Sequence, residues 1–295
     1  MKWLIWLVAA LGLGVATPRV TPVKRVEQPV TISIAVTGDV LLARSVNAKM
    51  VELNDFTYPW KNVAEKLRGA DVTYINLETP LTTDCRPTME GMTFCGDVRG
   101  VQGLKFAGVD VANLANNHAC NYGAAGLSQT KEVLRNAGIS WTGTEDGEPV
   151  IEVKKKKIGF LGFSDLGAGG CGINGTAKLT EKVKSLKELA DLVVVQFHFG
   201  LEYRDKPAVR QVNLARQAID AGADLVVGNH PHWIQTTERY KDKLIVYSHG
   251  NFIFDQTWSK KTMEGVVGWY EWENASVSAS FLPVNTGYDL QTRWE

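Results

Sequence analysis

Seven short runs of apolar residues recur along the chain and constrain its fold more than any other feature. Successive positions in each run are apolar, so both faces of the resulting strand would be buried, as in a covered sheet. The runs span 31–37, 72–77, 109–114, 158–163, 192–197, 225–227 and 244–247. Helical patterns alternate with them at 59–67, 124–136, 178–189 and 208–221. This alternation predicts an α/β fold in which crossover helices connect the strands.

The last part of the chain has a different pattern. Residues 265–295 include WYEWENASVSASFLPV, which alternates polar and apolar positions without a helical period. We therefore expect late antiparallel strands there. The four lysines at 154–157 lie between two β-rich runs, and we expect them to form a hairpin turn on a solvated edge.

The first residues form a segment of their own. One lysine precedes an apolar run over 3–16, which is short for a membrane span of about 20 residues but suits the core of a signal peptide. Small residues at the end of the run permit cleavage after Ala16, and an uncleaved membrane anchor is the alternative. We expect a secreted or extracytoplasmic protein with a signal peptide or anchor over 1–16, a proline-containing linker over 17–30 and one domain over 31–295.

Four cysteines follow this segment, and export from the cytoplasm would permit disulfides. Cys85 and Cys95 flank a short polar loop, so we expect a bridge between them. Cys120 and Cys171 form a second candidate pair, and free buried thiols are the alternative for a cytosolic protein. The absence of a C-x-x-C pair removes support for a structural zinc site.

The charge balance and the missing motifs exclude several functions. Basic and acidic residues both number 32, so the formal net charge is zero. Proteins dedicated to nucleic acids normally carry a basic excess, and we expect no nucleic-acid partner. The sequence also contains neither a G-x-S-x-G nucleophile elbow nor a phosphate-binding P-loop.

Polar side chains follow six of the predicted strands, at the point where each strand ends. They are Asp39, Glu78, Asn117-His118, His198, His230-Pro231-His232 and His249-Gly250-Asn251. All five histidines of the protein belong to this set. In α/β sheets the carboxyl ends of the strands form the ligand-binding edge, so we expect these side chains to converge there.

Such a mixture of carboxylates, amides and imidazoles predicts a metal site with nitrogen and oxygen ligands. In an extended segment, His230 and His232 would share one face and could reach the same metal or metal pair. Asp39 and Glu78 could instead act as a metal-free carboxylate pair, as in glycosidases. That alternative leaves the histidines unexplained.

Six blocks in order carry a resemblance to a known family. They read TGDVLLAR, INLETPLT, LANNHACNYG, HFGLEY, GADLVVGNHPHWIQ and YSHGNFIFD. From about residue 32 to about residue 255, the chain resembles the bacterial capsule synthesis proteins, the CapA/PgsA type of poly-γ-glutamate biosynthesis. That family looks like a divergent branch of the calcineurin-like metallophosphoesterases. The resemblance implies a two-sheet αββα sandwich with a metal centre at the strand ends.

The resemblance also implies roles for individual residues. The implied ligands of one or two divalent ions (Mn²⁺, Zn²⁺ or Fe) are Asp39, Glu78, Asn117, His198, His230 and His232. Glu78 would bridge the ions, and His118 would be a catalytic acid that faces the substrate. Two positions depart from a full phosphoesterase, because Leu41 replaces the histidine of a D-x-H block and Glu78 replaces an aspartate. One metal subsite therefore loses a ligand.

Further residues are candidates for contact with a substrate. Arg44, just past Asp39, is a candidate catalytic residue that would pair with a substrate carboxylate or phosphate, and a surface arginine is the alternative. Glu202, Tyr203 and Asn251 are candidate substrate-binding residues around the crevice. His249 is a further candidate, which either contacts the centre or caps a strand end.

Two functions follow from the resemblance. The first is a metal-dependent hydrolase that acts on a phosphoester or on a γ-glutamyl polymer. The second is a non-catalytic accessory protein that binds the anionic polymer or the membrane subunits of the capsule synthase. The retained ligand set favours the first function, and Leu41 favours the second.

Overall fold

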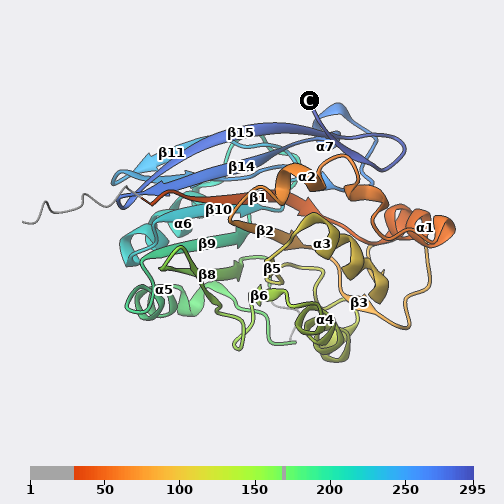
Figure 1. The fold of residues 1–295 in the computed structure, drawn as a ribbon, viewed down its shortest axis with the longest axis horizontal. Helices are drawn as coiled ribbons and strands as arrows, with labels where there is room; N and C mark the ends of the chain where they lie inside the picture. Colours follow the sequence, from red (N-terminus) through yellow and green to blue (C-terminus); the bar gives the residue numbers. More distant parts are fainter. Residues whose placement is uncertain (1–29, 168–170) are drawn as a thin grey trace, which may run out of the picture.

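Two β-sheets pack face to face, and helices cover the outer face of each (Figure 1). The structure is a computed structural model that describes residues 30–167 and 171–295. The predicted α/β fold and the two-sheet sandwich implied by the resemblance are confirmed. The predicted signal peptide or anchor over 1–16 and nearly all of the linker lie outside the described residues.

The first sheet has a parallel half and an antiparallel half. Its parallel strands are β1 (Ile32–Val40), β2 (Val72–Leu77), β5 (Val111–Asn113) and β6 (Ser140–Thr142). On the other side of β1 follow the antiparallel strands β14 (Glu264–Glu273), β15 (Ser276–Thr286) and β16 (Thr292–Trp294). The short strand β13 (Asn251–Ile253) pairs in parallel with the end of β1. The expected late antiparallel strands are therefore confirmed.

The second sheet is parallel at its centre and antiparallel at both edges. Its parallel strands are β8 (Lys156–Ser164), β9 (Leu192–His198), β10 (Leu225–Asn229) and β12 (Lys243–Val246). Its edge strands are β7 (Val150–Val153) and β11 (Thr237–Tyr240). Lys154 and Lys155 turn the chain from β7 into β8 with φ of 49° and 65°, so the predicted hairpin is confirmed. A separate small sheet pairs β3 (Leu81–Thr82) with β4 (Gly96–Asp97).

The helices fall into two groups. The first sheet is accompanied by α1 (Arg44–Leu53), α2 (Ala64–Leu67), α3 (Val101–Ala107) and α4 (Gly123–Ala137). The second sheet is covered by α5 (Leu179–Lys187) and α6 (Val209–Ala221). The short helix α7 (Lys260–Met263) precedes β14, and 3-10 turns occur at Tyr58–Trp60, Val98–Gly100 and Thr176–Lys178.

The helix predictions differ from the structure in two ways. The predicted helix over 59–67 is broken into a 3-10 turn and α2. The sequence pattern also missed α1, α7 and α3, and in α3 Gly103 lowers the helix propensity. A Cβ at that glycine would lie 2.4 Å from the carbonyl oxygen of Phe56 and 2.5 Å from Nε1 of Trp60. Gly103 is therefore required by packing against Trp60, which outweighs its propensity.

The core explains why the strand runs are apolar at successive positions. In β1, Ile32, Ile34 and Val36 face the second sheet, and Ala35 packs on the helix side. Side chains alternate between the two faces of a strand, and both faces of this strand are covered. The carboxyl ends of β1, β2 and β9 lie at one edge of the sandwich, because Asp39, Glu78 and His198 at these ends come together there.

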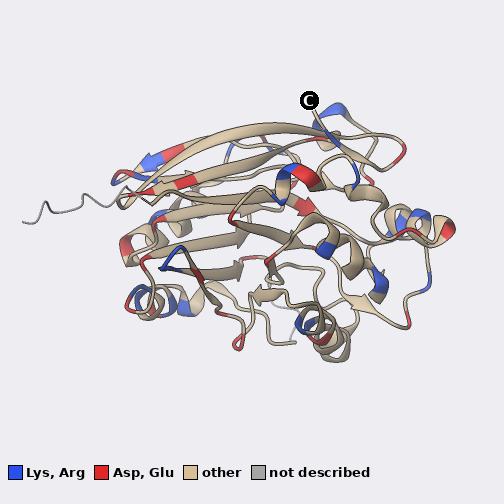
Figure 2. Cartoon of the chain, viewed as in Figure 1, with Lys and Arg blue, Asp and Glu red and all other residues tan. Residues whose placement is uncertain are grey.

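Charge is spread over the outside of the fold. Figure 2 shows acidic and basic residues interspersed along the helices and loops, while the inner strands are almost free of charge. Within 30–167 and 171–295, every helix is too short or too polar to cross a bilayer.

Both predicted disulfides are present. Cys85 is bonded to Cys95 with Cα atoms 5.5 Å apart, and Cys120 is bonded to Cys171 with Cα atoms 6.1 Å apart. All four cysteines of the chain are thus bridged. Disulfides form and persist in oxidising compartments, which agrees with an extracytoplasmic environment.

The two bridges should contribute unequally to stability. They enclose sequence separations of 10 and 51 residues, and the longer loop restricts the unfolded chain more. We expect C120S/C171S to lower the free energy of unfolding by about 4 kcal/mol and C85S/C95S by about 3 kcal/mol. Urea unfolding of the two double variants measures both values. A larger loss for the shorter loop would contradict this entropic explanation.

Candidate metal centre

β1 supplies Asp39 from within the strand. The sequence placed this residue beyond the strand end, which is wrong, because β1 continues to Val40. The register between β1 and β2 shifts between Val36 and Asp39, and such irregularities re-aim side chains. Gly38 makes this local geometry possible, since a Cβ there would lie 2.2 Å from the carbonyl oxygen of Gly250. The backbone N–H of Asp39 donates to that same carbonyl at 3.0 Å.

The second sheet supplies three histidines. His198 is the last residue of β9, and His230 and His232 follow β10. The segment 230–232 is bent rather than extended, with φ of 97° at His230 and 57° at His232. The extended geometry expected from the sequence is therefore wrong. A non-glycine residue in this region costs about 1–3 kcal/mol, so the fold sustains strain to keep both rings at the site.

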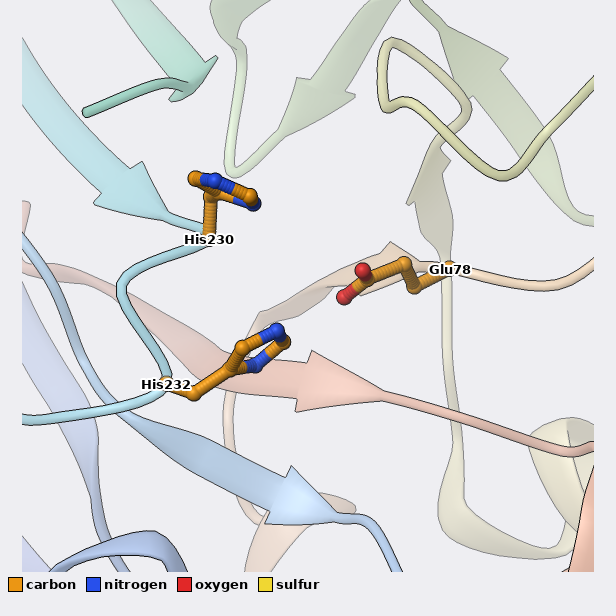
Figure 3. Close-up of side chains that lie close together, drawn as sticks. All are labelled: Glu78, His230 and His232. Carbon is orange, nitrogen blue, oxygen red and sulfur yellow. The ribbon is translucent and has the colours of Figure 1, made fainter. Parts of the chain in front are cut away.

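The first sheet contributes Glu78, which faces these histidines across the sandwich. Figure 3 shows Glu78, His230 and His232 directed toward one another. These three residues offer ligand atoms that all lie within 4.8 Å of one another. Asp39, Glu78 and His198 form a second such group with the same limit. Glu78 belongs to both groups, as the bridging role implied by the resemblance requires.

The surroundings of Glu78 test whether a cation suits the site. Its side chain is fully buried, and neither carboxylate oxygen has a hydrogen-bond partner. Nδ1 of His230 is likewise buried without a partner. An unpartnered buried carboxylate is strongly unfavourable, and a divalent ion would satisfy it. The nitrogen and oxygen donors suit Zn²⁺, Mn²⁺ or Fe rather than Mg²⁺ or Ca²⁺.

Protonation of the cluster reflects its burial. Burial and the charge of Asp39 raise the pKa of Glu78 well above its usual range. Burial lowers the pKa of His230 to about 3 and that of His198 well below its usual range. Burial also opposes protonation of His232, but the hydrogen bond to Asp39 and nearby carboxylates raise its pKa to about 9. Metal ions would take the place of the protons that Glu78 and His232 hold.

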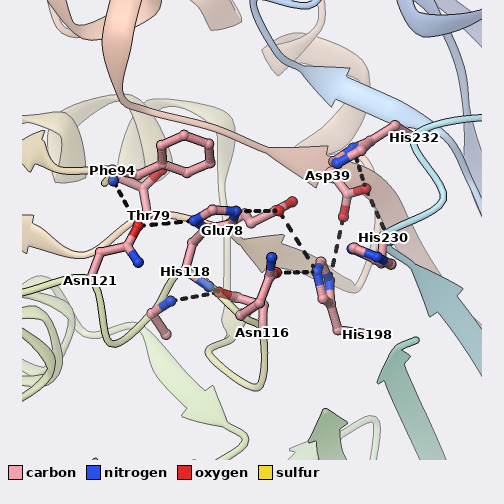
Figure 4. Close-up of polar contacts among 12 residues, drawn as sticks. Asp39, Glu78, Thr79, Phe94, Asn116, His118, Asn121, His198, His230 and His232 are labelled. Atoms are coloured by element: carbon pink, nitrogen blue, oxygen red, sulfur yellow. Dashed lines mark hydrogen bonds and ion pairs between the residues drawn. The ribbon is translucent and has the colours of Figure 1, made fainter. Parts of the chain in front are cut away.

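His198 lies within ion-pair distance of Asp39 and Glu78 (Figure 4), and amide side chains add further contacts to the ligands. Asn76 donates to Oδ1 of Asp39 at 2.8 Å and to Nδ1 of His198 at 3.1 Å. Oδ1 of Asn117 accepts from Nε2 of His198 at 2.8 Å, so the implied ligand Asn117 lies at the cluster. Asn76 was not predicted as a site residue, although a lone amide near the end of the apolar strand VTYINL was a usable signal.

Asn251 contacts His232, one of the implied ligands. Its Oδ1 accepts from Nδ1 of His232 at 2.9 Å, and its Nδ2 donates to the carbonyl of Thr262 at 2.8 Å. Asn251 is buried and does not line the cavity described below. In the structure it orients His232, and the predicted contact with a substrate stays a prediction.

His118 faces the cluster from the loop after β5. Its Nε2 lies 3.8 Å from Oε1 of Glu78. Its Nδ1 donates to Oδ1 of Asn121 at 2.9 Å, and that oxygen also accepts from the backbone N–H of Phe94 at 2.7 Å. The Phe94 ring stacks on the imidazole with centroids 3.8 Å apart. These contacts fix the ring with Nε2 toward the cluster, and Asn121 and Phe94 were not predicted from the sequence.

A cavity of about 320 Å³ opens above His118 and His232. Predicted residues that line it are Arg44, Glu202 and Tyr203. Arg44 is paired with Asp255, and its guanidinium lies 4.7 Å from the centre of the Phe94 ring. Only 14% of its side chain is exposed, so Arg44 is a cavity residue and the surface alternative is wrong.

Leu41 occupies the position where a histidine ligand was missing. It is fully buried in a small apolar cluster with Ala43, Phe94 and Phe254. Leu41 offers no donor atom to a metal ion. No other histidine takes its place, because four of the five histidines are the site residues described above and the fifth, His249, contacts Tyr270.

His249 lies apart from the ligand groups. It is fully buried, and its Nε2 lies 2.7 Å from the hydroxyl of Tyr270. Its Nδ1 lies 3.3 Å from the carbonyl oxygen of Gly228. His249 does not line the cavity. Two roles were considered for it, contact with the metal centre and capping of a strand end, and the contact with Gly228 in β10 agrees with the second. Substrate contact by His249 stays a prediction.

The class of fold is evident from a solved structure. A phosphatase from Mycoplasma pneumoniae superposes on this chain with a TM-score of 0.59 and 14% sequence identity. The superposition covers 88% of this chain and 95% of that chain. Together with the sheet order, it shows that the two chains share a two-sheet αββα sandwich fold.

The family is shown by sequence. The family model described as "Bacterial capsule synthesis protein PGA_cap" matches residues 33–256. The capsule biosynthesis protein CapA of Bacillus anthracis is 32% identical over 294 residues, which covers 91% of this chain and 71% of that protein. The PGA biosynthesis protein CapA of Bacillus subtilis is 29% identical over 285 residues, which covers 90% and 74%. The chain belongs to the bacterial capsule synthesis protein family, as predicted.

Stability at low pH should depend on His249. Burial lowers its pKa from 6.5 to about 4, so the unfolded chain binds a proton here before the folded protein does. Its contribution is therefore complete above pH 6.5 and is lost as the pH falls toward 4. Between pH 7 and pH 4, we expect the wild type to lose roughly 3 kcal/mol more unfolding free energy than His249→Gln.

Urea unfolding of both proteins at the two pH values measures this difference. Titration of the ligand cluster is common to both proteins and cancels in the comparison. Equal losses in the wild type and the variant would show that His249 is not held neutral by burial.

Proposed function

We propose that this protein is an extracytoplasmic, metal-dependent hydrolase of capsule poly-γ-glutamate biosynthesis, acting on a phosphoester or on the γ-glutamyl polymer. The observation that carries the proposal is the position of Glu78. Its two unpartnered, buried oxygens lie between ligand groups from both sheets. Membership of the capsule synthesis family supports the biosynthetic context.

The proposed ligands come from both sheets. Asp39 and Glu78 supply oxygens, and His198, His230 and His232 supply nitrogens, with Asn117 as a further oxygen donor at His198. One or two divalent ions, Mn²⁺, Zn²⁺ or Fe, would acidify a water molecule and polarise a phosphoryl or acyl oxygen.

The protein's own residues would bind and orient the substrate. His118 would act as the acid in its imidazolium form, in which Nδ1–H donates to Asn121 and Nε2–H delivers a proton to the leaving group. Arg44 would pair with a phosphate or carboxylate at the cavity wall. The Arg44 side chain is prepared for this role, since Asp255 and the Phe94 ring fix the guanidinium. Its backbone φ of 46° adds to the strained positions around the site.

A second candidate function is supported by Leu41. With that side chain buried in an apolar cluster, one subsite has fewer ligands than a full phosphoesterase. The protein would then be a non-catalytic accessory that binds the anionic polymer or membrane subunits of the synthase. Secretion or anchoring through residues 1–16 would bring either form of the protein to the membrane surface.

Metal content and turnover separate the two candidates. We expect the wild type to retain one or two ions and to hydrolyse a phosphodiester or poly-γ-glutamate. The variants Glu78→Gln and H198A/H232A should lose the ions and at least about a hundredfold of the turnover, because ligands that hold the ions are removed. Elemental analysis and a turnover screen measure both effects.

Glu145→Gln is the matched control for Glu78→Gln, since Glu145 is 81% exposed and its ion pair is with Lys178, outside the ligand groups. It should keep metal and turnover. If H198A/H232A restores capsule formation in a deletion strain as well as the wild type does, the accessory function is correct and the hydrolase proposal is wrong.

A further inference from the structure

One half-buried carboxylate in the cavity above the ligand cluster lacks a cationic partner. Glu202 lines this cavity and is half-buried, and none of the ion pairs among the described residues involves it. Arg44, the arginine that shares the cavity, pairs with Asp255 and not with Glu202.

Aromatic rings stand beside this carboxylate. Tyr203 follows Glu202 directly, and its ring meets that of Trp258 edge to face with centroids 5.0 Å apart. Gln256 donates to the Tyr203 hydroxyl at 3.1 Å and so fixes the ring. Trp258 also lines the cavity and is 61% exposed. A carboxylate combined with aromatic faces is a chemistry that recognises ammonium groups.

The rest of the cavity favours an anion. At its floor lie His118 and His232, next to the ligand groups that would hold divalent cations. The cavity therefore presents a region for an anionic group and a separate wall for a cationic one. A segment from the middle of a polyanion would bring only carboxylates, which Glu202 and the exposed Glu90 at the same cavity would repel.

We propose that the cavity binds the free amino end of a γ-glutamyl chain, with its ammonium at Glu202, Tyr203 and Trp258. The α-carboxylate of the same terminal unit would face the ligand cluster. In a γ-linked chain, the amino-terminal unit alone carries an ammonium beside its α-carboxylate, so it matches both walls. The cavity of about 320 Å³ is at the small end of the about 300–1,000 Å³ usual for ligand sites, which suits a chain end. This inference rests on the proposed function and specifies its substrate.

Calorimetric titration of the Mn²⁺-loaded full chain tests the inference. The probes are a γ-glutamyl trimer with a free amino end and the same trimer with an acetylated amino end. We expect the wild type to bind the free trimer at least about tenfold more tightly, the effect of one charge-assisted hydrogen bond. In Glu202→Gln the preference should fall below about threefold, and Trp258→Leu should reduce it partly.

Glu145→Gln is the control and should keep the full preference. Equal binding of the two trimers by the wild type, binding of neither, or an unchanged preference in Glu202→Gln would overturn the inference. The wild-type comparison decides the matter even if Glu202→Gln fails to fold. Metal content measured on the same samples separates the two failures, because a protein without metal contradicts the proposed function, whereas metal-loaded protein without preference contradicts this inference alone.

Discussion

The buried carboxylate of Glu78 is the constraint on which the site depends. It follows β2 of the first sheet, and its partners in the two ligand groups come from β1 and from the second sheet. Neither oxygen has a hydrogen-bond partner. A bound cation would compensate the charge of this buried carboxylate. The face-to-face packing of the sheets, the bulge at Gly38 and the strained turn at His230 and His232 all place donors around this one group. The rigid apolar core thus holds the two carboxylates, Asp39 and Glu78, close together despite their like charge.

The two disulfides restrain the segments that carry His118 and the cavity wall. Cys95 adjoins Phe94, whose ring and backbone N–H contact His118 and Asn121. Cys120 lies between His118 and Asn121 and is bonded to Cys171. The irregular segments that shape the cavity therefore gain covalent restraint where the sheets provide none. An oxidising compartment would favour both the bridges and the geometry of His118.

Much of the fold was predictable from the sequence because the strands are buried on both faces and leave strong apolar runs. The run 72–77 coincides with β2, and polar residues at strand ends identified the ligand groups. Features set by long-range contacts were not predictable. The bulge that keeps Asp39 within β1 depends on Gly250, and the partner of Arg44 is Asp255, far along the chain. The bend at 230–232 places His230 and His232 at positive φ, a backbone region that residues other than glycine rarely adopt, so it was not predicted.

Glu78 is proposed as the ligand that the two groups share, holding one or two metal ions. Anomalous X-ray diffraction at the zinc edge, from crystals of the full chain soaked in Zn²⁺, tests it most directly. We predict one or two peaks at about 2.0–2.2 Å from the Glu78 oxygens, with Asp39 and the histidines of the two groups as the remaining ligands. A map without a peak at Glu78, or one in which its oxygens are hydrogen-bonded to protein groups instead, would contradict the account.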